Sequence, residues 1–149
     1  MIIKCMLPAK SDIFLSKLID GISTNYFWHI YDDEVYLTVD DNISIDSEQL
    51  FSIHRLRGTL LKNISFQQPY WIISCKLLAT EIETNQEIGI YTYNQFVQSD
   101  YNLVISISDT QYVTVFVKKR IDYNIILSNM AKWSFHNITC FPVLEDYKI

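Results

Sequence analysis

The sequence predicts a single α+β domain with a mixed, largely antiparallel sheet of about seven strands and three to four helices. Its 149 residues match the common size of one domain with one core. Hydrophobic residues make up 49% of the chain and charged residues 19%, a composition that excludes a disordered protein. Short aromatic and β-branched runs alternate with segments of helical spacing, in the order strand, helix, hairpin, helix, strand, helix, hairpin, helix, strand. We therefore treat residues 1–149 as one domain.

The N-terminal segment predicts a strand followed by a short helix. Residues 2–7 are apolar and β-branched, and Pro8 ends them. Ser11 is a candidate N-cap, and the apolar residues after it recur at helical spacing to about Asp20. Gly21 then stands where a helix commonly ends.

Two further segments complete the first half. Residues 26–31 and 35–39 are rich in aromatic and β-branched residues, and the pair Asp32-Asp33 between them is typical of a turn, so we expect a hairpin. Residues 47–63 mix apolar and basic side chains around Gly58, which predicts one broken helix or two short helical pieces.

The second half has clearer signals. Residues 70–80 predict a long strand after Pro69, and Thr92 is a candidate cap for a short helix that ends before Asn102. Residues 103–108 and 112–118 predict a hairpin with Asp109-Thr110 at its tip. A last helix starts at Asp122. A final strand over residues 137–143 contains Pro142, which favours a sheet edge.

The predicted order contains strand–helix–hairpin–helix twice. Residues 30–39 loosely parallel residues 107–115. An internal duplication and a chance likeness between two short hairpins both remain open.

Part of the chain resembles a known family. The run Tyr70-Trp71-Ile72-Ile73, together with residues 93–109 and Tyr112-Val113, is similar to a small domain-of-unknown-function family from Bacillus-type bacteria. The resemblance covers about residues 69–131 and consists of aromatic, aliphatic and turn residues. It implies a bacterial, intracellular protein and no particular activity.

Several classes of function are excluded by what the chain lacks. Gly21, Gly58 and Gly89 stand alone, so neither a Rossmann fingerprint nor a P-loop is present. Cys5, Cys75 and Cys140 are about seventy residues apart in apolar segments, which predicts three buried free thiols and no zinc site. We expect no cofactor and no metal.

No apolar run approaches the length of a membrane span, and no secretory signal is visible at the N-terminus. These observations predict a cytoplasmic protein that does not bind membranes.

Charge distribution is the clearest functional signal. No Lys or Arg occurs between Lys17 and Arg55, whereas that stretch holds eight carboxylates and the chain as a whole carries a net charge of -5. Such a segment can steer a basic partner, and the reading we favour is a non-enzymatic protein-binding module of the immunity or antitoxin type. The simpler reading is a solvated turn and linker. The candidate partner-binding residues are Asp32, Asp33, Glu34, Tyr36, Asp40, Asp41, Asp46 and Glu48.

Other candidate sites are weaker. Residues 40–46 offer oxygen ligands for Ca²⁺ but lack the Gly and Glu of an EF-hand loop. The clusters Arg55/Arg57/Lys62 and 118–120 are too small, in an acidic protein, to predict nucleic-acid binding. His29, His54 and His136 each stand alone in the sequence.

The alternative function is a small ligand-binding domain or hydrolase-type enzyme with a pocket near His29. Alternation puts Tyr26, Trp28 and Ile30 on one strand face and Phe27, His29 and Tyr31 on the other. An exposed second face beside the carboxylates would favour the binding module. A structural protein that forms homo-oligomers through an aromatic face or a sheet edge is the third hypothesis.

Overall fold

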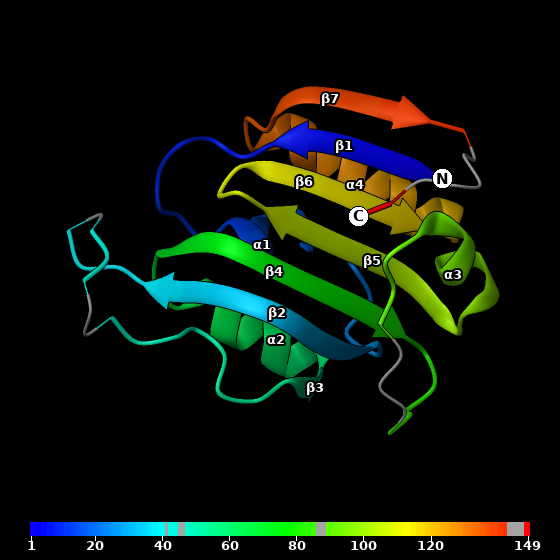
Figure 1. Ribbon diagram of the computed structural model, residues 1–149, viewed down its shortest axis with the longest axis horizontal. Coiled ribbons are helices and arrows are strands. Elements are labelled where there is room, and N and C mark those ends of the chain that lie inside the picture. The colour runs from blue at the N-terminus through cyan, green and yellow to red at the C-terminus, as the bar shows by residue number, and fades with distance from the viewer. Residues whose placement is uncertain (41, 45–46, 86–88, 143–147) are drawn as a thin grey trace.

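One seven-stranded antiparallel sheet forms the centre of the molecule, with strand order β3-β2-β4-β5-β6-β1-β7 (Figure 1). The computed structural model describes residues 1–40, 42–44, 47–85, 89–142 and 148–149. All six strand pairings are antiparallel. The elements are β1 (Ile2–Met6), α1 (Phe14–Leu18), β2 (Phe27–Leu37), β3 (Arg55–Arg57), α2 (Gly58–Phe66), β4 (Tyr70–Thr80), α3 (Tyr93–Gln98), β5 (Tyr101–Ser108), β6 (Tyr112–Val117), α4 (Arg120–Lys132) and β7 (His136–Phe141). The predicted fold class is confirmed.

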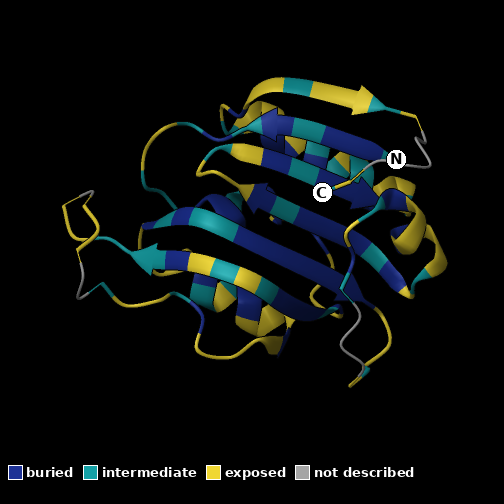
Figure 2. Ribbon diagram, viewed as in Figure 1, coloured by how far each residue is buried: buried dark blue, intermediate teal, exposed yellow. Residues whose placement is uncertain are grey.

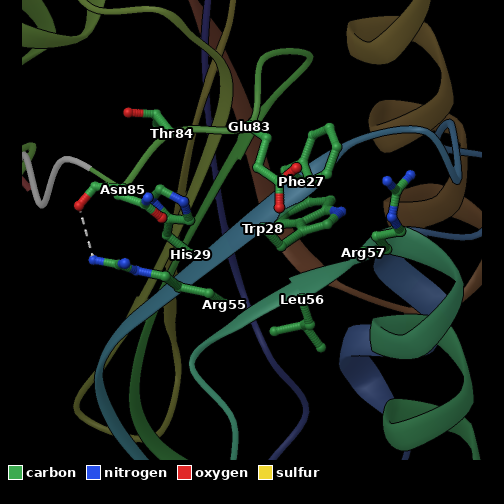
Figure 3. Close-up of a pocket in the computed structure, with 9 residues that line it drawn as sticks. All are labelled: Phe27, Trp28, His29, Arg55, Leu56, Arg57, Glu83, Thr84 and Asn85. Atoms are coloured by element: carbon green, nitrogen blue, oxygen red, sulfur yellow. Dashed lines mark hydrogen bonds between the residues drawn. The ribbon is translucent and has the colours of Figure 1, made fainter.

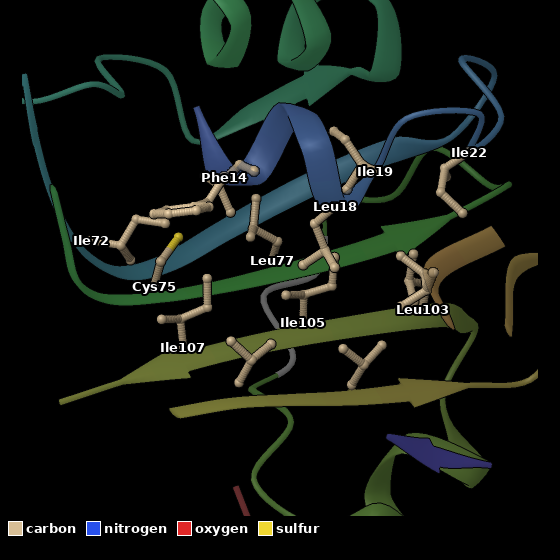
Figure 4. Packing of buried hydrophobic residues seen from close by; sticks show 14 of the residues in the cluster. Phe14, Leu18, Ile19, Ile22, Ile72, Cys75, Leu77, Leu103, Ile105 and Ile107 are labelled. Atoms are coloured by element: carbon tan, nitrogen blue, oxygen red, sulfur yellow. The ribbon is translucent and has the colours of Figure 1, made fainter. Parts of the chain in front are cut away.

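Helices lie on both faces of the sheet (Figure 1). Helices α1, α2 and α4 cover one face, here called the three-helix face, and α1 contacts both of the others. Figure 4 shows α1 packed through Leu18 above Leu77 and Ile105 of the sheet. This is the larger core.

The opposite face, here called the α3 face, is covered only in part. Phe96 of α3 and Tyr93 pack on Phe116, with ring centroids 5.6 and 5.1 Å away. Together with Leu78 and Val104 they form a second, smaller core. Away from α3 this face of the sheet carries half-buried and exposed residues (Figure 2).

Four sequence predictions match the structure closely. The long strand is β4, and the second hairpin is β5 and β6. Thr92 caps α3 through a full capping box with Gln95. The last strand, β7, is an edge of the sheet, as Pro142 indicated.

The first predicted hairpin is wrong, because its two halves form a single strand, β2. Asp32 adopts a left-handed backbone with φ 48°, and the pairing with β4 shifts register there. The two aspartates therefore form a β-bulge and not a turn. Aspartate tolerates the left-handed region, so the sequence signal for both structures is the same.

The helix predicted within residues 47–63 is also partly wrong. Residues 55–57 form β3, which pairs with the start of β2, and α2 begins at Gly58 instead of being interrupted there. A Cβ on Gly58 would lie 2.9 Å from the carbonyl oxygen of Thr24, so this glycine permits a close approach of two backbones.

Two smaller predictions need correction. Helix α1 begins after Ser11, because Asp12 exchanges backbone hydrogen bonds with Tyr70 and keeps the chain extended there. Cys140 is exposed, because its apolar strand is the sheet edge, whereas Cys5 and Cys75 are buried as expected.

The order of elements repeats, but their placement does not. Strand β1 lies between β6 and β7, far from β2 and β3, whereas β4, β5 and β6 are contiguous. Helices α1 and α2 share one face, while α3 and α4 lie on opposite faces. The topology therefore does not support a duplicated unit. Among the described helices, none has the length and apolarity needed to cross a membrane.

Candidate functional site

The bulge at Asp32 divides β2 into two halves with different surroundings. In the first half, Trp28 and Ile30 face the larger core, and His29 faces the α3 side. In the second half, Val35 is buried in the larger core, so its neighbours Glu34 and Tyr36 face the α3 side. The candidate residues from the sequence lie on this second half and on the loop after it.

Asp33 does not belong to an acidic surface. Its side chain is only 10% exposed, and its Oδ1 lies 2.8 Å from Nε2 of His54. The contact joins the bulge to the end of the loop that precedes β3. Its second oxygen, Oδ2, is buried without a hydrogen-bond partner within the part of the chain that the structure describes.

Four of the predicted carboxylates are exposed: Asp32, Glu34, Asp40 and Glu48. None of them has an ion pair among the described residues. Backbone hydrogen bonds from Leu37 to Glu48 and from Leu50 to Val35 hold the returning loop beside β2. The other two predicted residues, Asp41 and Asp46, lie outside the described residues.

Aromatic side chains accompany these carboxylates. Tyr36 is half-buried and directly opposite Trp71 of β4, which is also half-buried. Beside the loop, a hollow of about 330 Å³ is lined by residues that include Glu48 and Gln68. The described acidic groups thus lie along the second half of β2 and the loop after it.

At the other end of β2 the structure has a cavity of about 210 Å³ (Figure 3). Three segments distant in sequence meet there: residues 27–29 of β2, residues 55–57 of β3, and the connection 83–85. The sequence offered one indirect signal, because alternating Arg-Leu-Arg is typical of a short, protected edge strand.

His29 lines this cavity and is 3% exposed. Its Nδ1 is 2.7 Å from the hydroxyl of Tyr101, and the two rings are nearly perpendicular. Burial raises the pKa of Tyr101, so its phenol stays protonated. The partner of this nitrogen is therefore a phenol and not a carboxylate.

Burial disfavours the two buried thiols as nucleophiles. Burial raises the pKa of Cys5 to about 12, and burial together with Asp33 and Asp32 raises that of Cys75 as well. A thiol reacts as its thiolate, which these positions disfavour. In the described part of the chain, no group of three or more His, Cys, Asp or Glu is placed to hold a metal ion.

Comparison with known proteins identifies the family. No curated protein and no solved structure shows significant similarity to the chain. A family model matches residues 1–148, which confirms the resemblance seen over residues 69–131 and extends it over nearly the whole chain. The chain belongs to DUF2691, a family of proteins of unknown function.

Proposed function

We propose that this protein is a non-enzymatic binding module that presents the acidic end of β2 to a basic protein partner. The observation that carries the proposal is the set of four exposed carboxylates, Asp32, Glu34, Asp40 and Glu48, that have no ion pair among the described residues. Carboxylates that are not neutralised within their own chain remain available to a cationic surface.

Aromatic residues beside the carboxylates fit an interface. Tyr36 and Trp71 lie opposite each other on the α3 face, where no described helix covers them. Tyrosine and tryptophan are enriched at the centres of protein interfaces, because they bury much area at little entropic cost. The charged groups would set the association rate and the aromatic pair would supply contact area.

The partner class follows from charge. A protein that binds nucleic acid has a basic groove, so an acidic module can occupy and neutralise that groove. We therefore propose an immunity or antitoxin-like role toward a basic toxin such as a nuclease, in the cytoplasm. The buried thiols, and the phenol that engages His29, favour binding over catalysis.

The test uses two variants of equal charge. The first combines Glu34→Gln, Asp40→Asn and Glu48→Gln. The control combines Asp20→Asn, Glu83→Gln and Asp100→Asn, which are exposed carboxylates away from this end of β2. Each variant removes three negative charges, so any difference in affinity between the two reports the position of the carboxylates and not the net charge.

Partners are first captured from the host lysate and identified, and the purified partner is then titrated against all three proteins. We expect the first variant to lose about tenfold or more in affinity, mainly through slower association at low salt, and the control to lose little. Equal affinity of both variants, or a partner without a basic surface, would contradict the proposal.

A further inference from the structure

We propose that the cavity at the start of β2 binds a small molecule that carries an oxyanion, a carboxylate or a phosphate, held by Arg57. The site lies at the opposite end of β2 from the acidic residues. It does not depend on the function proposed above.

The fold places both arginines on the same face of β3, at the cavity. Leu56, between them, is 7% exposed and packs into the larger core, so Arg55 and Arg57 must both face the α3 side. Pairing with β2 sets Arg55 opposite His29 and Arg57 opposite Phe27. Figure 3 shows the two side chains pointing apart, Arg55 toward Asn85 and Arg57 to the Phe27 side of the cavity.

Each guanidinium is held by a neighbour. Arg57 lies over the ring of Phe27, 4.7 Å from its centroid, and forms no ion pair among the described residues. Stacking fixes the plane of a guanidinium and leaves its N–H groups at the edge, the arrangement that binds an oxyanion through two parallel hydrogen bonds. Nη2 of Arg55 donates to the carbonyl oxygen of Asn85, 3.1 Å away, which anchors this arginine to the connection over the cavity.

The volume of the cavity and its remaining wall restrict the size and polarity of the ligand. A cavity of about 210 Å³ is small for a nucleotide or a drug-sized ligand, which need roughly 300 Å³ or more. Glu83, Thr84 and Asn85 also line it, and the carboxylate of Glu83 lies on the Phe27 side (Figure 3). A carboxylate favours a ligand that carries a hydrogen-bond donor as well as its oxyanion. An amino acid or its phosphate ester has this size and this combination of groups.

The test compares binding of three probes, inorganic phosphate, serine and O-phosphoserine, followed by the amide and arginine signals of isotope-labelled protein. We expect saturable shifts confined to residues 27–29, 55–57 and 83–85 for at least one probe. Tighter binding of inorganic phosphate than of serine would assign the oxyanion as a phosphate, and the reverse as a carboxylate. The absence of a saturable shift with every probe up to about 10 mM, a concentration that detects even weak millimolar binding, would overturn the proposal.

Variants of Arg57 test whether this side chain binds the oxyanion. Arg57→Gln should weaken binding about tenfold or more. Arg57→Lys keeps the charge but loses the paired hydrogen bonds, so its affinity should lie between those of the wild type and Arg57→Gln. Arg120→Gln is the matched control, because Arg120 also stacks on an aromatic ring, Tyr123, but lies outside the cavity. Thermal unfolding of each variant shows that it is folded. Unchanged binding in Arg57→Gln, or an equal loss in Arg120→Gln, would refute a site at this arginine.

Discussion

Asp122 lies in the first turn of α4, 3% exposed, and its carboxylate accepts a 2.6 Å hydrogen bond from the hydroxyl of Tyr26. Burial, and then the neighbouring carboxylate, raise the pKa of Tyr26, so the phenol keeps the proton that it donates. This contact fastens α4 to the chain just before β2. It also gives the buried carboxylate of Asp122 a hydrogen-bond donor.

Replacement of Tyr26 by Phe should therefore destabilise the protein. The variant keeps the packed ring but leaves the buried carboxylate without this donor, which costs about 1–3 kcal/mol. Urea unfolding measures the difference. Tyr112→Phe, at an exposed position on β6, is the control and should change stability little. Equal effects of the two substitutions would mean that the hydroxyl of Tyr26 contributes nothing special.

Asp12 predicts a pH dependence of stability. Burial alone would raise its pKa, but hydrogen bonds from Lys17 and from the amide of Ile13 lower the pKa below its usual 3.8. The stability that the carboxylate supplies is then fully present above pH 3.8 and is lost as the pH falls through the lower folded-state value. Asp12→Asn should be less stable than wild type at neutral pH, and the two should converge in strong acid. If the gap persists there, or if it is unchanged in a Lys17→Met background, this ion pair is not its source.

At the scale of elements, β2 shows what the sequence could predict and what it could not. The outer boundaries of its two apolar runs were predictable from residue type, because aromatic and β-branched residues favour strands wherever they occur. The continuity of the strand was not, since it depends on β4, which pairs with β2 from Thr80 to Tyr70. Pairing between strands more than thirty residues apart cannot be detected in a short stretch of sequence.

The bulge in β2 predicts how substitutions at Asp32 change stability. Asp32 has φ 48°, a conformation that a β-branched side chain adopts only at a cost of about 1–2 kcal/mol. Asp32→Val should destabilise by about that amount, whereas Asp32→Asn should be nearly neutral because asparagine tolerates the left-handed region. Chemical denaturation of both variants is the measurement. A neutral Val variant would show that the strand can pair without the bulge.

The start of α2 depends on Gly58 for a different reason. Its backbone is not left-handed, but an added Cβ would meet the carbonyl oxygen, Cα and carbonyl carbon of Thr24 at 2.9 to 3.1 Å. Gly58→Ala must therefore push two backbone segments apart, at a cost of about 1–3 kcal/mol. Thr59→Ala, one residue further along the same helix and exposed, is the control. A stabilised Gly58→Ala variant, as helix propensity alone would give, would contradict the close approach.

At the scale of the whole molecule, both proposed sites lie where the sheet ends. The acidic residues border the loop after β2, and the cavity joins β2 to the short edge strand β3 and to the connection before α3. The sequence predicted the acidic stretch because it is contiguous. It gave a pocket near His29 only as the alternative, and it could not predict the other walls, because Arg57 and Asn85 meet His29 only in the folded chain.

This arrangement predicts a gradient of local stability across the sheet. Strands β4, β5 and β6 are paired on both sides and largely buried, whereas β7 is an edge strand with mostly exposed residues (Figure 2). Amides that are paired and buried exchange only on large-scale opening, while edge amides exchange through local fraying. Hydrogen exchange followed by mass spectrometry should therefore show slow exchange in peptides from β4 to β6 and fast exchange in β3 and β7. Protection of β7 equal to that of β5 would mean that something covers this edge in solution, and concentration dependence of that protection would identify a second copy of the chain.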